Sequence, residues 1–294
     1  MTTKKINTLV EDIYTLFDPN VTHTPNEDNL NEVAETIKGI LRTRLAEREP
    51  IGSPLRFSSL GKPDRQIWYM AHPEEGEPPE ELTAKTYFKF LYGDLIETLL
   101  LFLAKESGHT VERMQEEIEV DGVKGHIDAI IDGVVVDVKS ASPFGYQKFK
   151  TGDIFQDDPF GYVHQLAGYA DVLTPGEPAA WIPFDKVGGD ITVTTLPTSI
   201  IKDNLPAPRI EQLKKVVEPD AEIPPRCYEP VPDGKSGNLK LPTPCAYCAF
   251  KHRCHTGLRT FLYSTGPRYL TKVVKVPDVR ELIVGTPDEP EVTD

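Results

Sequence analysis

The stretch VKGHIDAIIDGVVVDVK, residues 123–139, is the part of the chain that decides the fold. An Asp-Gly pair at 132–133 separates two apolar runs within it, and a second such pair stands just before it at 121–122. Asp-Gly tolerates the positive φ angles of a tight hairpin turn. The pattern therefore predicts an antiparallel meander of three strands. Their expected ranges are 116–120, 123–131 and 134–140.

The last of these strands carries an acid and a lysine on the same face. Side chains alternate along a strand, so Asp137 and Lys139 point one way while the intervening valines point the other. Asp128 stands on the preceding strand, and two carboxylates on adjacent strands can converge on one oxygen-loving cation. The carbonyl of Val138 is a further candidate ligand. Mg²⁺ or Mn²⁺ in such a site would activate water for phosphodiester hydrolysis, and Lys139 would stabilise negative charge.

These residues resemble the signature of the PD-(D/E)XK superfamily of nucleases, in which an Asp precedes a (D/E)xK strand. Three further motifs strengthen the resemblance. The segment GDLIE, ending at Glu97, resembles the GxxxE motif of lambda-exonuclease and RecB-like nucleases. Gln165 and Tyr169 resemble the QxxxY motif of RecB-like enzymes. The segment 58–69, with SSLG, Arg65 and Trp68-Tyr69, resembles the N-terminal part of phage-type members.

The resemblance implies an α/β restriction-endonuclease-like core, a mixed sheet flanked by helices, with a helical N-terminal part and a cysteine-cluster C-terminal lobe. It implies a DNA exonuclease in phage-type replication, recombination or DNA degradation. The alternatives are a structure-specific endonuclease and a non-catalytic DNA-processing subunit. DNA is the expected partner, and a single-strand-binding or recombination protein is a second candidate. The implied metal ligands are Glu97, Asp128, Asp137 and Val138, and the implied catalytic residues are Glu97, Asp128, Asp137, Lys139, Gln165 and Tyr169.

Four cysteines, Cys227, Cys245, Cys248 and Cys254, fall within one short segment. Four thiolates suit a tetrahedral Zn²⁺ or a [4Fe-4S] cluster. The run from Cys245 to Cys254 resembles the C-terminal cysteine triplet of iron-sulfur nucleases, which favours [4Fe-4S] and leaves Zn²⁺ as the alternative. In those nucleases the fourth cysteine lies upstream, near the segment that matches 62–65. This chain has none there, so Cys227 or His255 is the candidate replacement.

The net charge of -14 argues against a protein that coats nucleic acid through bulk charge. The charge is uneven, however, because residues 251–275 hold six Lys or Arg and no Asp or Glu. A local basic surface there could grip DNA. The candidate DNA-binding residues are Arg65, Lys148, Lys150, Lys251, Arg253 and Arg259.

The remaining patterns suggest four regions. These are a helical part at 1–55, the nuclease core at 56–220, the cysteine lobe at 221–275, and an acidic, disordered tail at 276–294. We expect a buried helix at 83–105 and an ordered loop at 142–160. Further helices are expected at 31–48, 161–173 and 210–217, and further strands at 180–184 and 190–195. The first residues form no secretory signal and the apolar runs are too short to span a membrane. A cytoplasmic location is expected, in the host cell if the protein is viral.

Overall fold

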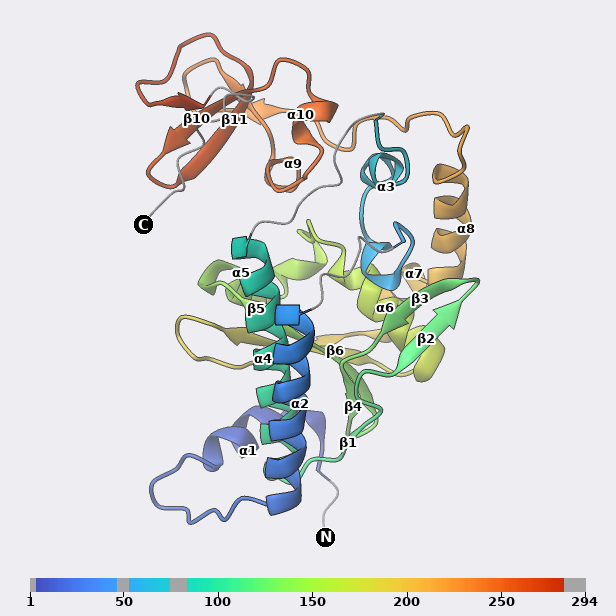
Figure 1. The fold of residues 1–294 in the computed structure, drawn as a ribbon, viewed down its shortest axis with the longest axis vertical. Helices are drawn as coiled ribbons and strands as arrows, with labels where there is room; N and C mark the ends of the chain where they lie inside the picture. Colours follow the sequence, from blue (N-terminus) through green and yellow to red (C-terminus); the bar gives the residue numbers. More distant parts are fainter. Residues whose placement is uncertain (1–3, 47–52, 75–83, 283–294) are drawn as a thin grey trace. The chain divides into compact units, whose positions relative to one another are not determined.

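A computed structural model describes residues 4–46, 53–74 and 84–282 (Figure 1). The chain forms two compact units, and each is described by itself. The first unit contains Met1–Gly61 and Gly76–Lys215, and the second contains Lys62–Glu75 and Val216–Asp294. Among the described residues, no helix combines the length and the hydropathy needed to cross a bilayer.

The first unit is built on a mixed sheet of five strands in the order β1-β4-β5-β6-β7. The central pair, β5 and β6, is parallel, and every other neighbouring pair is antiparallel. A parallel pair needs a crossover connection, which here carries two helices and a 3-10 turn. The strands are β1 (Val111–Glu112), β4 (Ala129–Ile131), β5 (Val134–Ala141), β6 (Ala179–Asp185) and β7 (Thr194–Leu196). The crossover holds α5 (Pro143–Thr151), η3 (Asp153–Phe155) and α6 (Tyr162–Leu173).

The core of this unit lies where helices α1 (Leu9–Thr15) and α4 (Ala84–Glu106) meet the sheet. Leu100 of α4 is buried in one cluster with Val136 and Val138 of β5. Because side chains alternate along β5, Asp137 and Lys139 lie on the opposite face. The alternation expected from the sequence is therefore present. The remaining helical elements of the unit are η1 (Ile6–Thr8), α2 (Glu27–Ala46), η2 (Phe57–Ser59), α7 (Thr198–Asp203) and α8 (Pro206–Val216).

The predicted three-stranded meander is wrong in one respect. The expected strand 123–131 is broken at Ile127 and Asp128, so that β2 (Glu117–Val120) and β3 (Val123–His126) form a separate hairpin. The backbone groups of these two residues bond to the segment before β2. Ile127 donates to the carbonyl of Glu116, and the carbonyl of Asp128 accepts from Gln115 at 3.2 Å. The β4–β5 hairpin, with its Asp132 turn, follows the break.

The expected loop at 142–160 is also wrong, because its first half is helix α5. Ser142 caps this helix, and its side-chain oxygen accepts from the amide of Gly145 at 3.2 Å. Pro143 follows in the first turn, where its missing N–H costs nothing. Gly152 closes the helix at a φ of 81°. These are ordinary start and stop signals of a helix.

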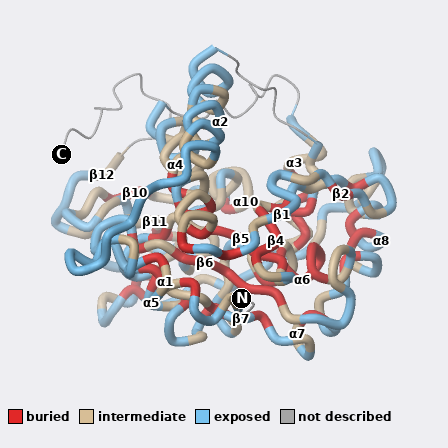
Figure 2. The backbone as a smooth tube through the Cα atoms, turned by 90° about the horizontal axis from the view of Figure 1, so that it is seen from below, coloured by how far each residue is buried: buried red, intermediate tan, exposed pale blue. Residues whose placement is uncertain are grey.

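Helix α4 is less buried than its all-round apolar sequence predicts. Only its C-terminal half reaches the core, and Phe88 and Phe90 in the first half are 67% and 43% exposed. Helix α2 runs antiparallel beside it, with ion pairs Arg44–Asp94 and Lys105–Glu32 at the two ends of the contact (Figure 1). Figure 2 shows α2 as a largely exposed helix, and no residue of α2 is buried.

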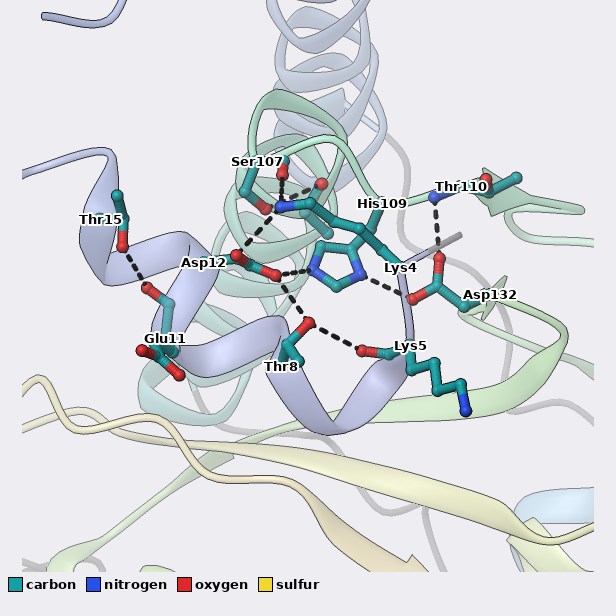
Figure 3. A network of polar contacts seen from close by, with 11 residues as sticks. Lys4, Lys5, Thr8, Glu11, Asp12, Thr15, Ser107, His109, Thr110 and Asp132 are labelled. Atoms are coloured by element: carbon teal, nitrogen blue, oxygen red, sulfur yellow. Dashed lines mark hydrogen bonds and ion pairs between the residues drawn. The ribbon is translucent and has the colours of Figure 1, made fainter. Parts of the chain in front are cut away.

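A buried histidine fixes the N-terminal helix α1 to this unit (Figure 3). His109 Nδ1 lies 2.6 Å from Asp132 Oδ2, and its Nε2 lies 3.1 Å from Asp12 Oδ2. Asp12 also pairs with Lys4 at 3.0 Å and accepts a hydrogen bond from Thr8 at 2.7 Å. The β4–β5 turn, the segment that follows α4 and the first turn of α1 are therefore joined through the imidazole ring of His109.

The second unit contains an antiparallel sheet in the order β12-β10-β11-β9-β8. The expected disordered tail at 276–294 is wrong for its first residues, because Glu281 lies in β12 and pairs with Arg259 of β10 at 2.6 Å. The rest of the predicted tail lies outside the described residues. The elements are α3 (Asp64–Ala71), β8 (Val231–Pro232), β9 (Leu239–Lys240), α9 (Thr243–Ala246), α10 (Lys251–Cys254), β10 (Arg259–Tyr263), β11 (Gly266–Lys272) and β12 (Glu281–Leu282).

Candidate active site and cysteine cluster

The three carboxylates indicated by the sequence come from three segments of the first unit. Glu97 lies within α4, Asp128 directly precedes β4, and Asp137 lies within β5. Asp128 Oδ2 accepts a hydrogen bond from the amide of Val138 at 2.6 Å, which ties Asp128 to the strand that carries Asp137. The carboxylate of Glu97 accepts from the side chain of Gln115. Since Gln115 also donates its backbone amide to Asp128, it connects the acid on the helix to the acid before β4.

Lys139 supplies the positive charge of this site. Its Nζ lies 2.8 Å from Asp137 Oδ1 and 2.7 Å from Oδ2. The second contact lacks hydrogen-bond geometry, so Asp137 Oδ2 is a buried oxygen without a hydrogen-bond partner. Burial lowers the pKa of Lys139, but Asp137, Asp128 and Tyr162 raise it by more. The ammonium also lies 4.8 Å from the centre of the Tyr162 ring. Lys139 therefore stays charged at neutral pH.

All three carboxylates have a pKa above the ordinary value. Burial raises the pKa of Asp128, and the charges of Glu97 and Asp137 raise it further. Burial also raises the pKa of Glu97 to about 7, with Asp137 contributing to the rise. For Asp137, burial raises the pKa while Lys139 lowers it. The hydrogen bonds through Gln115 and the Val138 amide place the three acids in one neighbourhood.

This donor set fits a hard divalent cation. Carboxylate oxygens are the ligands that Mg²⁺ and Mn²⁺ prefer, and a cation would offset the repulsion among these acids. As the side chains stand, no three His, Cys, Asp or Glu residues in the described part of the chain form a closed ligand set. Each acid instead faces a donor of the protein, namely Gln115, the Val138 amide or Lys139. The carbonyl of Val138 as a ligand stays a prediction.

Helix α6 brings the predicted Gln165 and Tyr169 to the same face of the sheet. Gln165 Nε2 donates to the hydroxyl of Tyr169 at 3.3 Å. Burial raises the pKa of Tyr169 to about 12, and the charges of Asp137 and Asp128 add to the rise. The ring of Tyr169 stacks on Phe57 with their centres 5.1 Å apart.

Close packing of glycines fixes the position of α6. A Cβ on Gly125 or on Gly168 would lie within 3.0 Å of the Phe57 side chain. A Cβ on Gly61 would lie 2.2 Å from the Cα of Gly161, which precedes α6. Residues 57–61, which contain SSLG, therefore act structurally, because Phe57 packs between the β2–β3 hairpin and α6 while Gly61 packs against Gly161.

The four cysteines lie in the second unit as free thiols. Burial raises the pKa of Cys245 to about 12, and the other three thiols add to the rise. Burial likewise raises the pKa of Cys248. A hydrogen bond from the Phe250 amide lowers this pKa, whereas Cys254 and Cys227 raise it further. The thiols are thus near one another, and a metal that binds thiolates would remove the cost of their clustering.

Helix α3 lies beside these cysteines, although it is far from them in sequence. Arg65 of α3 donates to the carbonyl of Pro224 at 2.6 Å and also forms a hydrogen bond with Cys254. Its backbone forms a hydrogen bond with the thiol of Cys227. The thiol of Cys227 raises the pKa of Cys245 and of Cys248. Cys227 or His255 as the fourth ligand stays a prediction.

Comparison with known proteins assigns no family. No family model matches the sequence, and no curated protein matches it. Among solved structures, the chain is similar to SSO0001, at 17% sequence identity and a TM-score of 0.39. The match covers 74% of this chain and 94% of that one. A likeness this distant carries no conclusion about fold or activity.

Several of the predicted DNA-binding residues are neutralised within their own unit. Arg259 forms a two-pronged pair with Glu281, with both contacts at 2.6 Å. Arg253 pairs with Glu74 at 2.8 Å. The basic segment 251–275 is therefore partly balanced by acids from other segments. The remaining candidates also have partners: Arg65 bonds Tyr69, Lys148 pairs with Asp157, Lys150 lies over the Tyr146 ring, and Lys251 lies over the Tyr269 ring.

Two residues of the site were not singled out from the sequence. Tyr162, beside Lys139, lies in the helix expected at 161–173, but no motif of the sequence pointed to it as a site residue. Gln115 carries no sequence signal, since it lies in a short loop between β1 and β2. Both Arg113 and Gln115 adopt positive φ angles, of 53° and 54°. Non-glycine residues rarely adopt this conformation, and a sequence does not reveal it.

Proposed function

We propose that this chain is a divalent-metal-dependent DNA nuclease of the PD-(D/E)XK kind, with a restriction-endonuclease-like core in the first unit. The observation that carries this proposal is the hydrogen bonding that links Glu97, Asp128 and the strand of Asp137 through Gln115 and the Val138 amide, beside the ammonium of Lys139. Burial raises the pKa of all three carboxylates. Perturbed carboxylates of this kind collect at functional sites. The order of the motifs along the chain favours exonuclease action, and phage-type DNA replication, recombination or degradation in a cytoplasm is the setting we propose.

Glu97, Asp128 and Asp137 would hold Mg²⁺ or Mn²⁺. When bound, such an ion supplies an acidified water and charge for the leaving oxygen. Lys139 would position the attacking water and stabilise negative charge on the phosphate, since its ammonium is held in place by Asp137 and the Tyr162 ring. Gln165 and Tyr169, joined by a hydrogen bond, would orient the DNA backbone beside Asp137.

For the second unit we propose a [4Fe-4S] cluster held by the four cysteines, with Zn²⁺ as the alternative. Its role would be structural. It would join the segment around Cys227 to the hairpin-rich region that follows Cys254, and it would also hold Arg65 of α3 against them. Metal content and visible absorption of anaerobically purified protein distinguish the two metals.

The test is digestion of end-labelled linear DNA with Mg²⁺, with EDTA as the control. Asp137→Asn should remove all metal-dependent cleavage while circular dichroism shows an intact fold. Glu211→Gln is the matched control, because Glu211 is an exposed residue of α8 that forms an ion pair with Lys215. Cleavage by Asp137→Asn at the rate of the wild type would refute the proposal. Nicking of a closed circular duplex would show endonuclease action instead.

A further inference from the structure

A pocket of about 260 Å³ opens beside the candidate active site. Its described walls come from α2, α4 and the loop that contains Met114 and Gln115. Glu97 belongs both to this pocket and to the carboxylate group around Asp137. A ligand that enters the pocket therefore reaches one of the proposed catalytic acids. The whole pocket lies within the first unit.

The walls of the pocket suit a flat, apolar ligand. Val33 of α2, Leu101 and Phe102 of α4, and Met114 of the loop are among its lining residues. Phe102 provides an aromatic ring, and bases stack on such rings whatever their identity. A cavity of about 150 Å³ is large enough to hold benzene. A pocket of about 260 Å³ therefore has room for a base of two fused rings.

The charge of the pocket excludes phosphate. Glu97 and Glu32 place two carboxylates on its wall. Among its described lining residues Lys105 is the cation, and its Nζ is paired with Glu32 Oε1 at 2.6 Å. A phosphate group would meet repulsion here, whereas the amino groups of a nucleobase can donate hydrogen bonds to carboxylates and to the Gln115 carbonyl. The chemistry favours the base of a nucleotide over its backbone.

The loop that closes the pocket is strained. Arg113 and Gln115, on either side of Met114, both have positive φ. An ion pair between Arg113 and Glu116 and the bond from the Gln115 amide to Asp128 hold this conformation. Backbone strain of this kind collects at binding and catalytic sites. The strained loop places Gln115 where the pocket meets Glu97.

We propose that this pocket receives the base of the terminal nucleotide of the DNA substrate, and so measures one nucleotide from the end. The inference rests on the proposed nuclease function and deepens it, because it ties the recognised feature to a free DNA end. Since either end is a candidate, each is to be tested on its own substrate.

The variant that tests the pocket is Thr36→Trp. Thr36 is an exposed residue of α2 that lines the pocket, so an indole there fills the space without disturbing a core. The control is Ala34→Trp, an exposed position on the same helix that is not among the lining residues. Neither residue belongs to the proposed catalytic group.

The first assay measures release of the terminal nucleotide from linear DNA with Mg²⁺. Loss of base stacking should slow the wild type roughly tenfold on a substrate whose terminal nucleotide lacks a base. Thr36→Trp should release the normal terminal nucleotide roughly tenfold more slowly than the wild type does. On the abasic end Thr36→Trp and the wild type should have the same rate. Ala34→Trp should match the wild type on both substrates. Equal rates of Thr36→Trp and wild type on the normal end would overturn the pocket proposal while leaving the nuclease proposal intact.

The second assay is independent of cleavage. DNA with 2-aminopurine at the terminal position is mixed with protein in EDTA, and its fluorescence is compared with that of DNA carrying the probe internally. We expect the terminal probe to respond to the wild type and to Ala34→Trp but not to Thr36→Trp. If no DNA is cleaved at all, the nuclease proposal fails and this assay alone decides the pocket. A terminal probe that responds equally to all three proteins, or to none, refutes the pocket.

Discussion

Replacing Gly61 by alanine tests how the SSLG segment places α6. The new Cβ would lie 2.2 Å from the Cα and 2.5 Å from the carbonyl oxygen of Gly161. Ordinary Cβ contacts begin at 3.4 Å, so the backbone segments around Gly61 and Gly161 would have to separate by roughly an ångström. Both partners are backbone atoms, and no side chain can rotate away. Gly161 is also held by Asp158, whose carboxylate accepts from its amide at 2.9 Å.

The free energy of unfolding of the first unit should therefore fall by about 3 kcal/mol, the upper end of the usual cost of overpacking. The matched control is Gly39→Ala in α2, where nothing lies within 4 Å of the new Cβ. A glycine inside a helix costs about 0.5–1 kcal/mol relative to alanine, so this variant should be more stable than the wild type.

The assay is urea unfolding followed by tryptophan fluorescence. The chain has two tryptophans, and Trp68→Phe leaves only Trp181, which is buried in β6 of the first unit. The remaining signal then reports the unit that contains Gly61. A Gly61→Ala variant within about 0.5 kcal/mol of the wild type would refute the packing described above, because overpacking against backbone costs more than that.

Three other predictions concern the proposed metal ligands Asp128 and Cys248 and the carboxylate of Glu106. Mg²⁺ should raise the thermal midpoint of the wild type but not of Asp128→Asn, because an ion that binds only the folded state stabilises it; equal shifts would refute the proposed ligand. Burial raises the pKa of Glu106, but hydrogen bonds from Asn29 and His23 lower it by more. The ionised carboxylate therefore stabilises the fold at a pH above its pKa in the unfolded chain. This stabilisation is lost as the pH falls through the lowered pKa of the folded state. Glu106→Gln should then be less stable than the wild type by about 1 kcal/mol at pH 7 and approach it in acid; a deficit that is the same at all pH values would contradict this. Cys248→Ser should lower the iron or zinc content measured by elemental analysis, and unchanged content would exclude Cys248 as a ligand.

Local patterns in the sequence were sufficient for much of the fold. The Asp132-Gly133 turn, the alternation that puts Asp137 and Lys139 on one face, and helix α6 all follow from short-range preferences of the chain. The start of α5 was equally local, since Ser142 and Pro143 are cap signals, and the prediction of a loop there overlooked them.

The tertiary structure decided the features that depend on distant partners. Gln115 reaches Glu97 only because a strained loop returns to α4. At the strand break the carbonyl of Asp128 accepts from the amide of Gln115, and Arg259 is neutralised by Glu281 from another strand. A residue's neighbours along the chain fix its backbone conformation and the face of the helix or strand on which its side chain lies. Its charge balance and its hydrogen-bond partners are set by segments that meet only after folding.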